Sequence, residues 1–326
     1  MSNRYVVTGG AGFIGSALAR EILATGESRV TIIDNLLTGH LRNLDEISTS
    51  VDLHKVDVRD FDATLRAIEG SEVIFHMAAI PSVPRSIREP VPSHEINIDG
   101  TFNVFQAAKQ AGVRRVVYAA SSSAYGDTEV LPKVETMSPS PKSPYAVQKL
   151  LGEYYASVFH SCFGLETVAL RFFNVYGPRQ DPDSPYSGVL SIFMRCILEG
   201  KAPTLHGDGN QSRDFTYVED VVGLLLKAST AGKQALGNTY NAGNGNRYTL
   251  NEVWRILGDI TGVRIAPQYA APREGDVRDS QADTTAAVRD LGHAPKFTLE
   301  EGLRRTFAWY RADAQVGAGA GQNVRA

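Results

Sequence analysis

The chain has few of the cysteines that form disulfides or zinc sites. Its 326 residues include two cysteines, Cys162 and Cys196, which are too few for a disulfide framework. We expect both to be buried small hydrophobic residues in a protein of the reducing cytoplasm. No Cys and His residues stand at metal-ligand spacing, so we expect no metal site.

Long apolar runs and an excess of one charge are also missing. No apolar run is long enough to cross a bilayer, and the first strand begins so close to Met1 that we expect no signal peptide. The chain has 33 Lys and Arg against 36 Asp and Glu, a formal net charge of −3, and no basic tract. Neither nucleic acid nor a membrane is therefore an expected partner.

What the chain does contain begins with a glycine-rich turn. The apolar run at 4–8 leads into GGAGFIG at 9–15, and a helical pattern follows. Gly9, Gly12 and Gly15 would let the backbone approach a pyrophosphate, which the partial positive charge of the helix start attracts. A second strand ends at Asp34, where an acid would bind a ribose diol and repel a 2′-phosphate. This arrangement predicts NAD rather than NADP.

The following strands extend this cofactor site. The third ends near Asp57, at a position suited to an adenine edge, and the fourth leads into the small residues Ala78 and Ala79. Small residues there would let the backbone lie against the cofactor. Strand and helix patterns alternate to about residue 173, which predicts an α/β fold with a Rossmann-type doubly wound parallel sheet.

A tyrosine and a lysine stand four residues apart in SPYAVQK at 143–149. On a helix this spacing puts Tyr145 and Lys149 on one face, one turn apart. A lysine ammonium stabilises a nearby phenolate, so we expect Lys149 to lower the pKa of Tyr145 from its ordinary value of about 10. The pair could then move a proton on and off an alcohol. Three serines at 121–123 end the fifth strand, where ligands bind in such a sheet.

These motifs resemble those of the extended short-chain dehydrogenase/reductases and, more narrowly, of the UDP-hexose 4-epimerases. The resemblance reaches to about residue 312, and within that family the chain is most similar to the UDP-N-acetylglucosamine 4-epimerases. The matching pieces are TGGAGFIG at 8–15, DVRD at 57–60, HMAA at 76–79, SSSAYG at 121–126, YAVQK at 145–149, RFFNVYGPRQ at 171–180, RDFTYVEDV at 213–221 and PREGDVRDSQAD at 272–283.

The resemblance implies NAD-dependent inversion at C4 of a UDP-sugar through a 4-keto intermediate, with Tyr145 and Lys149 as catalytic residues. Counting forward along the strand favours Ser123 as the catalytic hydroxyl, whereas counting back from Tyr125 selects Ser121. Ser121 and Ser122 therefore remain alternatives. The implied cofactor contacts are Gly9, Gly12, Phe13, Ile14, Gly15, Asp34, Asn35, Gly39, Asp57, Val58, Ala78, Ala79, Asn97, Tyr145 and Lys149.

The resemblance also implies a set of substrate contacts. Arg213 and Arg273 match two phosphate-binding arginines, and guanidinium forks suit that task. Ser280 matches the residue beside the sugar C2 group, where a small side chain leaves room for an N-acetyl group. The leading substrates are therefore UDP-GlcNAc and UDP-GalNAc. The full set of implied substrate contacts is Ser82, Ser122, Ser123, Asn174, Val189, Leu205, His206, Arg213, Arg273, Asp276 and Ser280.

Other functions remain open. UDP-glucuronate is a possible substrate because Arg85 could face its carboxylate, and the chain could also be a net dehydrogenase or a non-catalytic NAD sensor on the same fold. The dehydratases and decarboxylases of this superfamily carry an acid after the catalytic hydroxyl. This chain has Ser122-Ser123-Ala124-Tyr125 there, so both reactions lack a proton-transfer group.

We expect two interleaved domains. An NAD-binding domain spans 1–173 and regains 214–245, whereas 174–213 and 246–312 form a smaller α/β substrate-binding C-terminal domain, followed by a disordered tail at 313–326. The resemblance implies a homodimer in which helices around 96–111 and 145–163 pack as a four-helix bundle. Apolar positions that could serve that face, or the internal core, are Val104, Phe105, Ala108, Leu150, Tyr154 and Val158.

Overall fold

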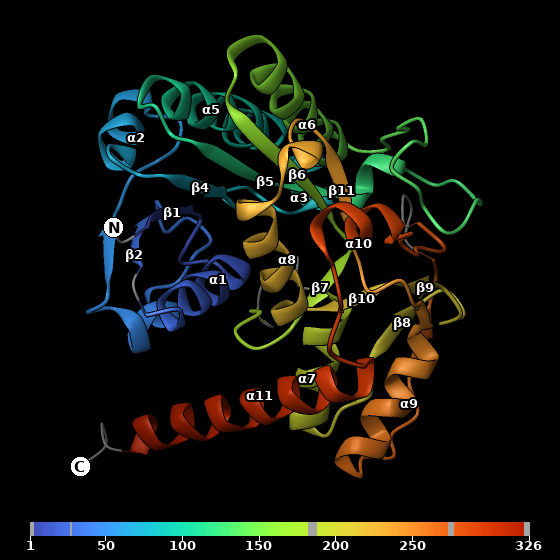
Figure 1. Cartoon of the computed structure of the whole chain (residues 1–326). Helices are drawn as coiled ribbons and strands as arrows, with labels where there is room; N and C mark the ends of the chain where they lie inside the picture. Colours follow the sequence, from blue (N-terminus) through green and yellow to red (C-terminus); the bar gives the residue numbers. More distant parts are fainter. Residues whose placement is uncertain (1–2, 27, 182–187, 273–276, 323–326) are drawn as a thin grey trace.

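A seven-stranded parallel sheet forms the centre of the protein (Figure 1). The computed structural model describes residues 3–26, 28–181, 188–272 and 277–322. The strand order is β11-β6-β5-β4-β1-β2-β3, and every pairing is parallel, which confirms the predicted Rossmann-type fold. The strands are β1 (Arg4–Thr8), β2 (Arg29–Ile33), β3 (Val51–His54), β4 (Val73–His76), β5 (Arg115–Ser121), β6 (Glu166–Phe172) and β11 (Thr239–Ala242).

Helices cover both faces of this sheet. One face packs against α1 (Phe13–Ala24) and α8 (Val218–Thr230), and the other against α2 (Phe61–Ile68), α5 (Gly100–Gln110) and α6 (Pro144–Phe163). The central strand β5 is buried along its first six residues, RVVYAA, because helices exclude water from both sides. The short helices α3 (Val83–Arg88) and α4 (Pro90–His94), followed by η2 (Glu95–Asp99), lead into α5.

Local signals fix the ends of α6, the helix that carries the tyrosine–lysine pair. The Ser143 hydroxyl accepts a hydrogen bond from the Ala146 N–H at 3.2 Å, and Pro144 occupies the first helical position. Gly164 ends the helix with a φ of 71°, a conformation that glycine adopts without strain. Tyr145 and Lys149 therefore lie in the first two turns of a well-defined helix.

The later part of the chain adds three two-stranded sheets and four helices, counted over the described residues. The strand pairs are β7 (Asn174–Tyr176) with β10 (Phe215–Tyr217), β8 (Thr204–His206) with β13 (Gln268–Ala270), and β9 (Ser212–Arg213) with β12 (Tyr248–Thr249). Besides α8, these helices are α7 (Val189–Glu199), α9 (Leu250–Thr261), α10 (Thr285–Leu291) and α11 (Leu299–Gln322), and the 3-10 turn η4 (Lys233–Ala235) follows α8. Two 3-10 turns lie earlier in the chain, η1 (Leu41–Ile47) and η3 (Ser122–Tyr125).

Two elements of this later part return to the central sheet, one as a strand in it and one as a helix that covers it. β11 pairs with β6, and α8 packs against α1 (Figure 1). Residues after β11 leave the central sheet again. The chain therefore crosses more than once between the central sheet and the region of small sheets and helices. The domain boundaries predicted from the sequence remain a prediction.

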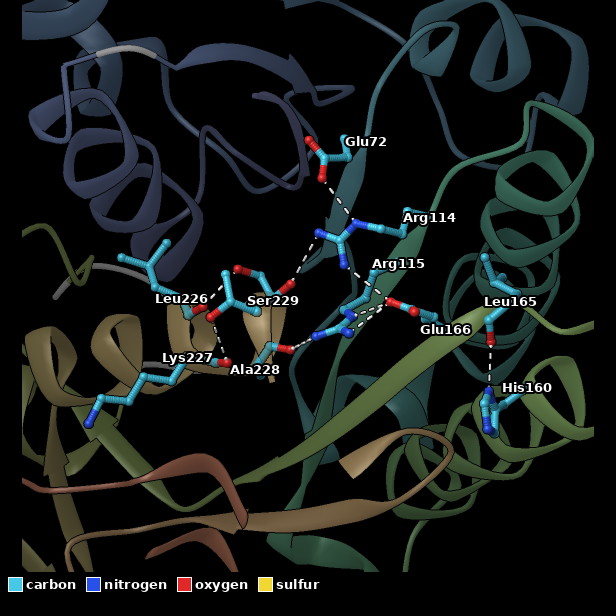
Figure 2. A network of polar contacts seen from close by, with 11 residues as sticks. Glu72, Arg114, Arg115, His160, Leu165, Glu166, Leu226, Lys227, Ala228 and Ser229 are labelled. Atoms are coloured by element: carbon cyan, nitrogen blue, oxygen red, sulfur yellow. Dashed lines mark hydrogen bonds and ion pairs between the residues drawn. The ribbon is translucent and has the colours of Figure 1, made fainter. Parts of the chain in front are cut away.

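An ion-pair network joins α8 to the amino ends of β5 and β6 (Figure 2). Arg115, which is 3% exposed, donates to Glu166 Oε2 at 2.7 and 2.9 Å and to the Ala228 carbonyl at 2.9 Å. Arg114 reaches Glu72 at 3.0 Å and the same Glu166 at 3.1 Å. Because Ala228 lies in the last turn of α8, the guanidinium satisfies an end-of-helix carbonyl and holds this helix on the sheet.

Two sequence-based expectations were wrong, and one open alternative is decided. Cys162 is exposed and Cys196 only partly buried. Of the six positions left open between the dimer face and the core, Val104, Phe105, Ala108 and Leu150 are buried within the chain, because α5 packs directly on α6 and β5. Residues 313–322 are helical rather than disordered, since each residue added to a formed helix gains a backbone hydrogen bond.

No helix in the described part of the chain is long and apolar enough to cross a membrane. Within the same residues, no three His, Cys, Asp or Glu side chains gather in a way that could hold a metal ion.

Candidate active site

A cavity of about 1000 Å³ opens at the carboxyl ends of the central strands. Its wall includes Gly9 after β1, Asp34 after β2, Ala78 after β4, and Ser121 at the end of β5. β1 is flanked by β2 on one side and β4 on the other, so the strand order reverses there. Ligands bind at such a switch point in open α/β sheets.

The glycine turn leaves room for a ligand against bare backbone. A Cβ on Gly15 would lie 2.3 Å from the Gly9 carbonyl oxygen, and one on Gly9, whose φ is +67°, would lie 2.8 Å from Ala78 Cα. The helix α1 begins at Gly12 with no side-chain cap and no acid in its first turn. Its N–H groups and partial positive charge therefore suit a pyrophosphate, and the residues present fit a dinucleotide.

Asp34 is placed to receive a ribose. It is 7% exposed, its carboxylate accepts from the Ala11 N–H at 2.9 Å and the Leu36 N–H at 2.8 Å, and it lines the cavity. Burial raises the pKa of this carboxyl, while the two N–H groups oppose the rise. A Cβ on Gly39 would approach the carboxylate oxygens to 2.8 and 2.9 Å, so a glycine is required beside it.

Two predicted cofactor residues do not reach the cavity wall. The Asp57 carboxylate binds the Arg59 guanidinium at 2.9 and 3.0 Å, and this hydrogen bonding lowers its pKa to about 2. Asn97 is 1% exposed and holds the Ile80 N–H at 2.8 Å and the Gln148 side chain at 2.8 Å. The other predicted cofactor residues all line the cavity: Gly9, Gly12, Phe13, Ile14, Gly15, Asp34, Asn35, Gly39, Val58, Ala78, Ala79, Tyr145 and Lys149.

The structure distinguishes the three serines. The Ser121 hydroxyl lies near enough to the phenol of Tyr145 to oppose the rise of the Tyr145 pKa that burial causes. Ser123 lies one step further away and donates to Ser121 Oγ at 2.9 Å. Ser122 lines the cavity beside them. The hydroxyl next to the phenol is therefore Ser121, the alternative obtained by counting back from Tyr125, rather than the favoured Ser123.

The electrostatics of the pair differ from the simple expectation. Burial raises the pKa of Tyr145 to about 12, and Lys149 is not among the groups that oppose this rise. Burial also lowers the pKa of Lys149 to about 7, against the attraction of Glu153. Lys149 is 4% exposed and its Nζ donates to the Ala119 carbonyl at 2.8 Å. In the protein alone, burial thus disfavours the charged form of both groups.

The predicted substrate residues divide into three groups. Lining the same cavity are Ser82, Ser122, Ser123, Asn174, Arg213 and Ser280. Val189, Leu205 and His206 are not in its wall: Leu205 is 1% exposed in the core, and the His206 ring bonds the Ala271 carbonyl at 3.1 Å. Arg273 and Asp276 lie outside the described residues.

Two cavity residues were missed by the sequence reasoning. Lys133 is 2% exposed, and its ammonium binds the Thr128 and Val130 carbonyls. Arg179 has a positive φ of 69° and binds Glu46 at 2.7 Å. Neither carries a spacing signal, although Arg179 stands inside the RFFNVYGPRQ motif and could have been singled out there.

The dinucleotide end and the proton-transfer end share one cavity, so hydride and proton can be exchanged with the same bound molecule. That combination defines a dinucleotide-dependent enzyme built on the short-chain dehydrogenase/reductase plan. The chain belongs to the NAD dependent epimerase/dehydratase family, whose model matches residues 5–243. It is therefore an enzyme, and its cofactor is NAD.

Individual relatives match over nearly the full chain. UDP-glucose 4-epimerase of Mycolicibacterium smegmatis is 38% identical over 96% of this chain and 100% of its own length. A UDP-glucose 4-epimerase from Thermotoga maritima, solved with UDP-glucose, is 36% identical with a TM-score of 0.91, covering 95% and 99% of the two chains. A UDP-N-acetylglucosamine 4-epimerase from Methanobrevibacter ruminantium, solved with UDP-N-acetylmuramic acid, is 36% identical with a TM-score of 0.91, covering 96% and 100%.

Proposed function

We propose that this protein inverts C4 of a UDP-sugar through a 4-keto intermediate, with UDP-GlcNAc and UDP-GalNAc as the preferred pair. UDP-glucose and UDP-galactose are a second pair that the same chemistry accepts. The observation that carries the proposal is that Ser121, Tyr145 and Lys149, one turn further along α6, all line the cavity that the glycine turn also lines. The similar proteins include a UDP-glucose 4-epimerase and a UDP-N-acetylglucosamine 4-epimerase, which supports the reaction but does not favour either sugar.

The chain's own residues move the proton. NAD, when bound, supplies the hydride acceptor and a positive charge on its nicotinamide ring. Tyr145 takes the proton of the sugar 4-hydroxyl, and Ser121 hydrogen-bonds the same oxygen. Lys149 favours the phenolate when it is charged. After the 4-keto sugar turns about its pyrophosphate linkage, hydride returns to the other face and Tyr145 gives the proton back. No net oxidation occurs, so the cofactor can stay bound.

The assignment of the catalytic hydroxyl now favours Ser121. Proton relay needs an oxygen close to the phenol, and of the three serines Ser121 is the one whose hydroxyl affects the pKa of Tyr145. Ser123 donates to Ser121, so it orients the hydroxyl rather than touching Tyr145. The sequence alone could not choose, because the two ways of counting gave different serines.

The preference for an N-acetylated sugar rests on Ser280. This serine lines the cavity, and its main-chain N–H donates to the Ser212 carbonyl at 3.1 Å, which fixes its backbone. A small side chain on a fixed backbone leaves volume that a bulky residue would fill. A bulky substitution at Ser280 should therefore exclude the N-acetylated sugar and leave the unacetylated one.

The test is incubation of the purified protein with UDP-GlcNAc or UDP-glucose, without added NAD, followed by separation of the products. Formation of UDP-GalNAc supports the proposal. Ser280→Tyr should lose the reaction with UDP-GlcNAc by at least about tenfold and retain that with UDP-glucose, whereas the matched control Ser280→Ala should keep both. Efficient turnover of UDP-glucose by the unaltered protein, with none of UDP-GlcNAc, contradicts the pocket argument.

UDP-glucuronate is the second candidate substrate. Arg85 lines the cavity and could meet a carboxylate. Its Nε, however, already donates to Glu89 at 2.9 Å, so its charge is partly compensated. The pair of Tyr145 and Lys149 argues against a non-catalytic sensor, since a sensor has no use for a proton-transfer pair.

We also propose a homodimer through α5 and α6, the two helices expected from the sequence. Tyr154 and Val158 of α6 remain 54% and 46% exposed. Phe102, Val147 and Phe163 on α5 and α6 are also exposed to between 40% and 49%. A second copy of these two helices would cover them and complete a four-helix bundle. The test is the molecular mass of the protein in solution. The unaltered protein should have the mass of a dimer, and Tyr154→Asp should have the mass of a monomer.

A cytoplasmic location also remains a proposal. Its support is that Cys162 and Cys196 are both free thiols, which suits a reducing compartment. Recovery of the protein in the periplasmic or secreted fraction of its host would contradict it.

A further inference from the structure

A histidine lies buried beneath the wall of the cavity. His76 ends β4, is fully buried and does not line the cavity itself. Its ring Nδ1 lies 2.7 Å from Thr8 Oγ1, and its Nε2 lies 3.0 Å from Thr101 Oγ1. Both threonines are buried as well. Because a buried polar group is costly unless it is hydrogen-bonded, the partners of this ring indicate what it holds in place.

One partner reaches the cavity wall at Ala78. The Ala78 N–H donates to Thr8 Oγ1 at 3.2 Å, and Ala78 lines the cavity. The glycine turn packs directly on this residue, since a Cβ on Gly9 would lie 2.8 Å from both the nitrogen and the Cα of Ala78. A shift of Ala78 would therefore displace the cavity wall together with the turn that suits a pyrophosphate.

The other partner reaches the same wall at Ile80. The Thr101 hydroxyl donates to the Asn97 carbonyl at 2.7 Å. The Asn97 side chain accepts from the Ile80 N–H at 2.8 Å and donates to the Ile80 carbonyl at 3.2 Å. Ile80 also lines the cavity. His76 is thus the middle of a chain of hydrogen bonds whose two ends hold the segment 78–80.

The donors and acceptors of this chain fit one form of the ring. The Thr101 hydroxyl gives its only hydrogen to Asn97, so its oxygen accepts from Nε2–H. Nδ1 then carries no hydrogen and accepts from the Thr8 hydroxyl. With the hydrogen on Nδ1 instead, Thr8 Oγ1 would receive two hydrogens, from the ring and from Ala78, and would lose the ring as an acceptor. Burial agrees with this form, because it lowers the pKa of His76 to about 3 and so keeps the ring neutral.

We propose that His76 is a positioning residue for the dinucleotide, a neutral imidazole with its hydrogen on Nε2 that holds the wall segment 78–80 against the glycine turn. It does not reach the cavity and acts through Thr8, Thr101 and Asn97. Asn97 therefore supports the cofactor site indirectly, in place of the direct contact predicted from the sequence. The proposal rests on NAD as the cofactor and not on the identity of the sugar, so a failure of the proposed function leaves it intact.

The experiment removes one link of the chain and measures how firmly NAD is held. Thr101→Val replaces the hydroxyl by a methyl group of similar size, so Nε2–H loses its acceptor. The rate at which bound NAD exchanges with isotopically labelled NAD in solution should rise about five- to tenfold, which corresponds to the loss of about one hydrogen bond. Thr101→Ser keeps the hydroxyl and should exchange NAD within about twofold of the unaltered protein. No rise for Thr101→Val, or an equal rise for both variants, would overturn the proposal.

Thr167→Val is the matched control. Thr167 is fully buried on β6, and its hydroxyl donates to the Ala156 carbonyl of α6 at 2.6 Å. Like Thr101→Val, this variant loses a buried hydroxyl that is bonded to a helix carbonyl, but it leaves the His76 chain untouched. It should lower the unfolding free energy, measured with urea, by a similar amount and leave NAD exchange unchanged. If it speeds NAD exchange as much as Thr101→Val does, the effect is a loss of stability alone and the proposal is wrong.

The form of the ring is tested directly by nuclear magnetic resonance of the NAD-bound protein with isotope-labelled histidine nitrogens, which differ in shift between the two neutral tautomers. The His76 signals are identified by their loss in His76→Gln. Near neutral pH they should show an uncharged ring with its hydrogen on Nε2. A hydrogen on Nδ1, or a charged ring, would contradict the donor order on which the proposal depends. This measurement uses the unaltered protein, so it can overturn the proposal even if Thr101→Val does not fold.

Discussion

The substitution Gly15→Ala sets two effects against each other: the steric clash of a Cβ in the cofactor turn and the higher helix propensity of alanine. Gly15 lies inside α1, where alanine is normally favoured over glycine by about 1 kcal/mol. A Cβ there would stand 2.3 Å from the Gly9 carbonyl oxygen and 2.8 Å from Gly10 Cα, both backbone atoms that cannot rotate away. The start of α1 must then retreat by roughly 1 Å to reach ordinary contact distance. Overpacking of this kind costs about 1–3 kcal/mol, so the steric effect wins.

The turn that moves is the one that would hold the pyrophosphate. We therefore expect Gly15→Ala to be purified with little or no NAD and to unfold at a lower temperature. The assays are the NAD released on denaturation, measured per mole of protein, and thermal unfolding with NAD in excess.

Gly223→Ala is the matched control because Gly223 lies inside α8 and a Cβ there meets no atom within 4 Å. This variant should keep its NAD and gain up to about 1 kcal/mol of unfolding free energy. The steric reasoning is refuted if Gly15→Ala retains full NAD and is as stable as Gly223→Ala.

The remaining predictions concern catalysis, acid stability and the amino edge of the sheet. Ser121→Ala should lower kcat by about 10²–10⁴ and Ser123→Ala by less, and the reverse order would restore the first assignment. The folded-state pKa of His76 is about 3, below its ordinary value near 6.5, so the unfolded chain binds a proton that the folded protein does not. Its contribution to stability is therefore complete above about pH 6.5 and is lost as pH falls toward 3. Between these pH values, His76→Gln should reduce the slope of the unfolding free energy against pH by an amount that corresponds to at most about one bound proton. An unchanged slope contradicts this. Glu166→Gln should lower the unfolding free energy by about 1–3 kcal/mol, measured by urea denaturation, because Arg115 stays buried with a charge that has lost its carboxylate.

Much of the fold and the cofactor end could be predicted because the signals were local. A glycine at a fixed spacing, an acid at a strand end and a Tyr–Lys pair on one helix depend on neighbours within a few residues. The parallel sheet was predicted from the alternation of strand and helix. The fold is confirmed by the sheet topology and NAD by the family match.

The rest required distances between residues far apart in the sequence. Whether Ser121 or Ser123 meets Tyr145 depends on the twist of the strand end against α6, which no spacing rule contains. Asp57 was predicted to contact the cofactor, but Arg59, two residues on, takes its carboxylate. Val104 and Leu150 looked equally suited to an interface or a core, because an apolar stripe does not say which surface covers it.

The same packing sets an order of events during synthesis. When the chain has been made only as far as β6, the face of the sheet under α1 still lacks α8, and Arg115 lacks the Ala228 carbonyl. Residues 218–242 must leave the ribosome before β11 can pair with β6 and the sheet is finished. A fragment that ends at residue 173 is thus an unfinished domain rather than a separable cofactor-binding module.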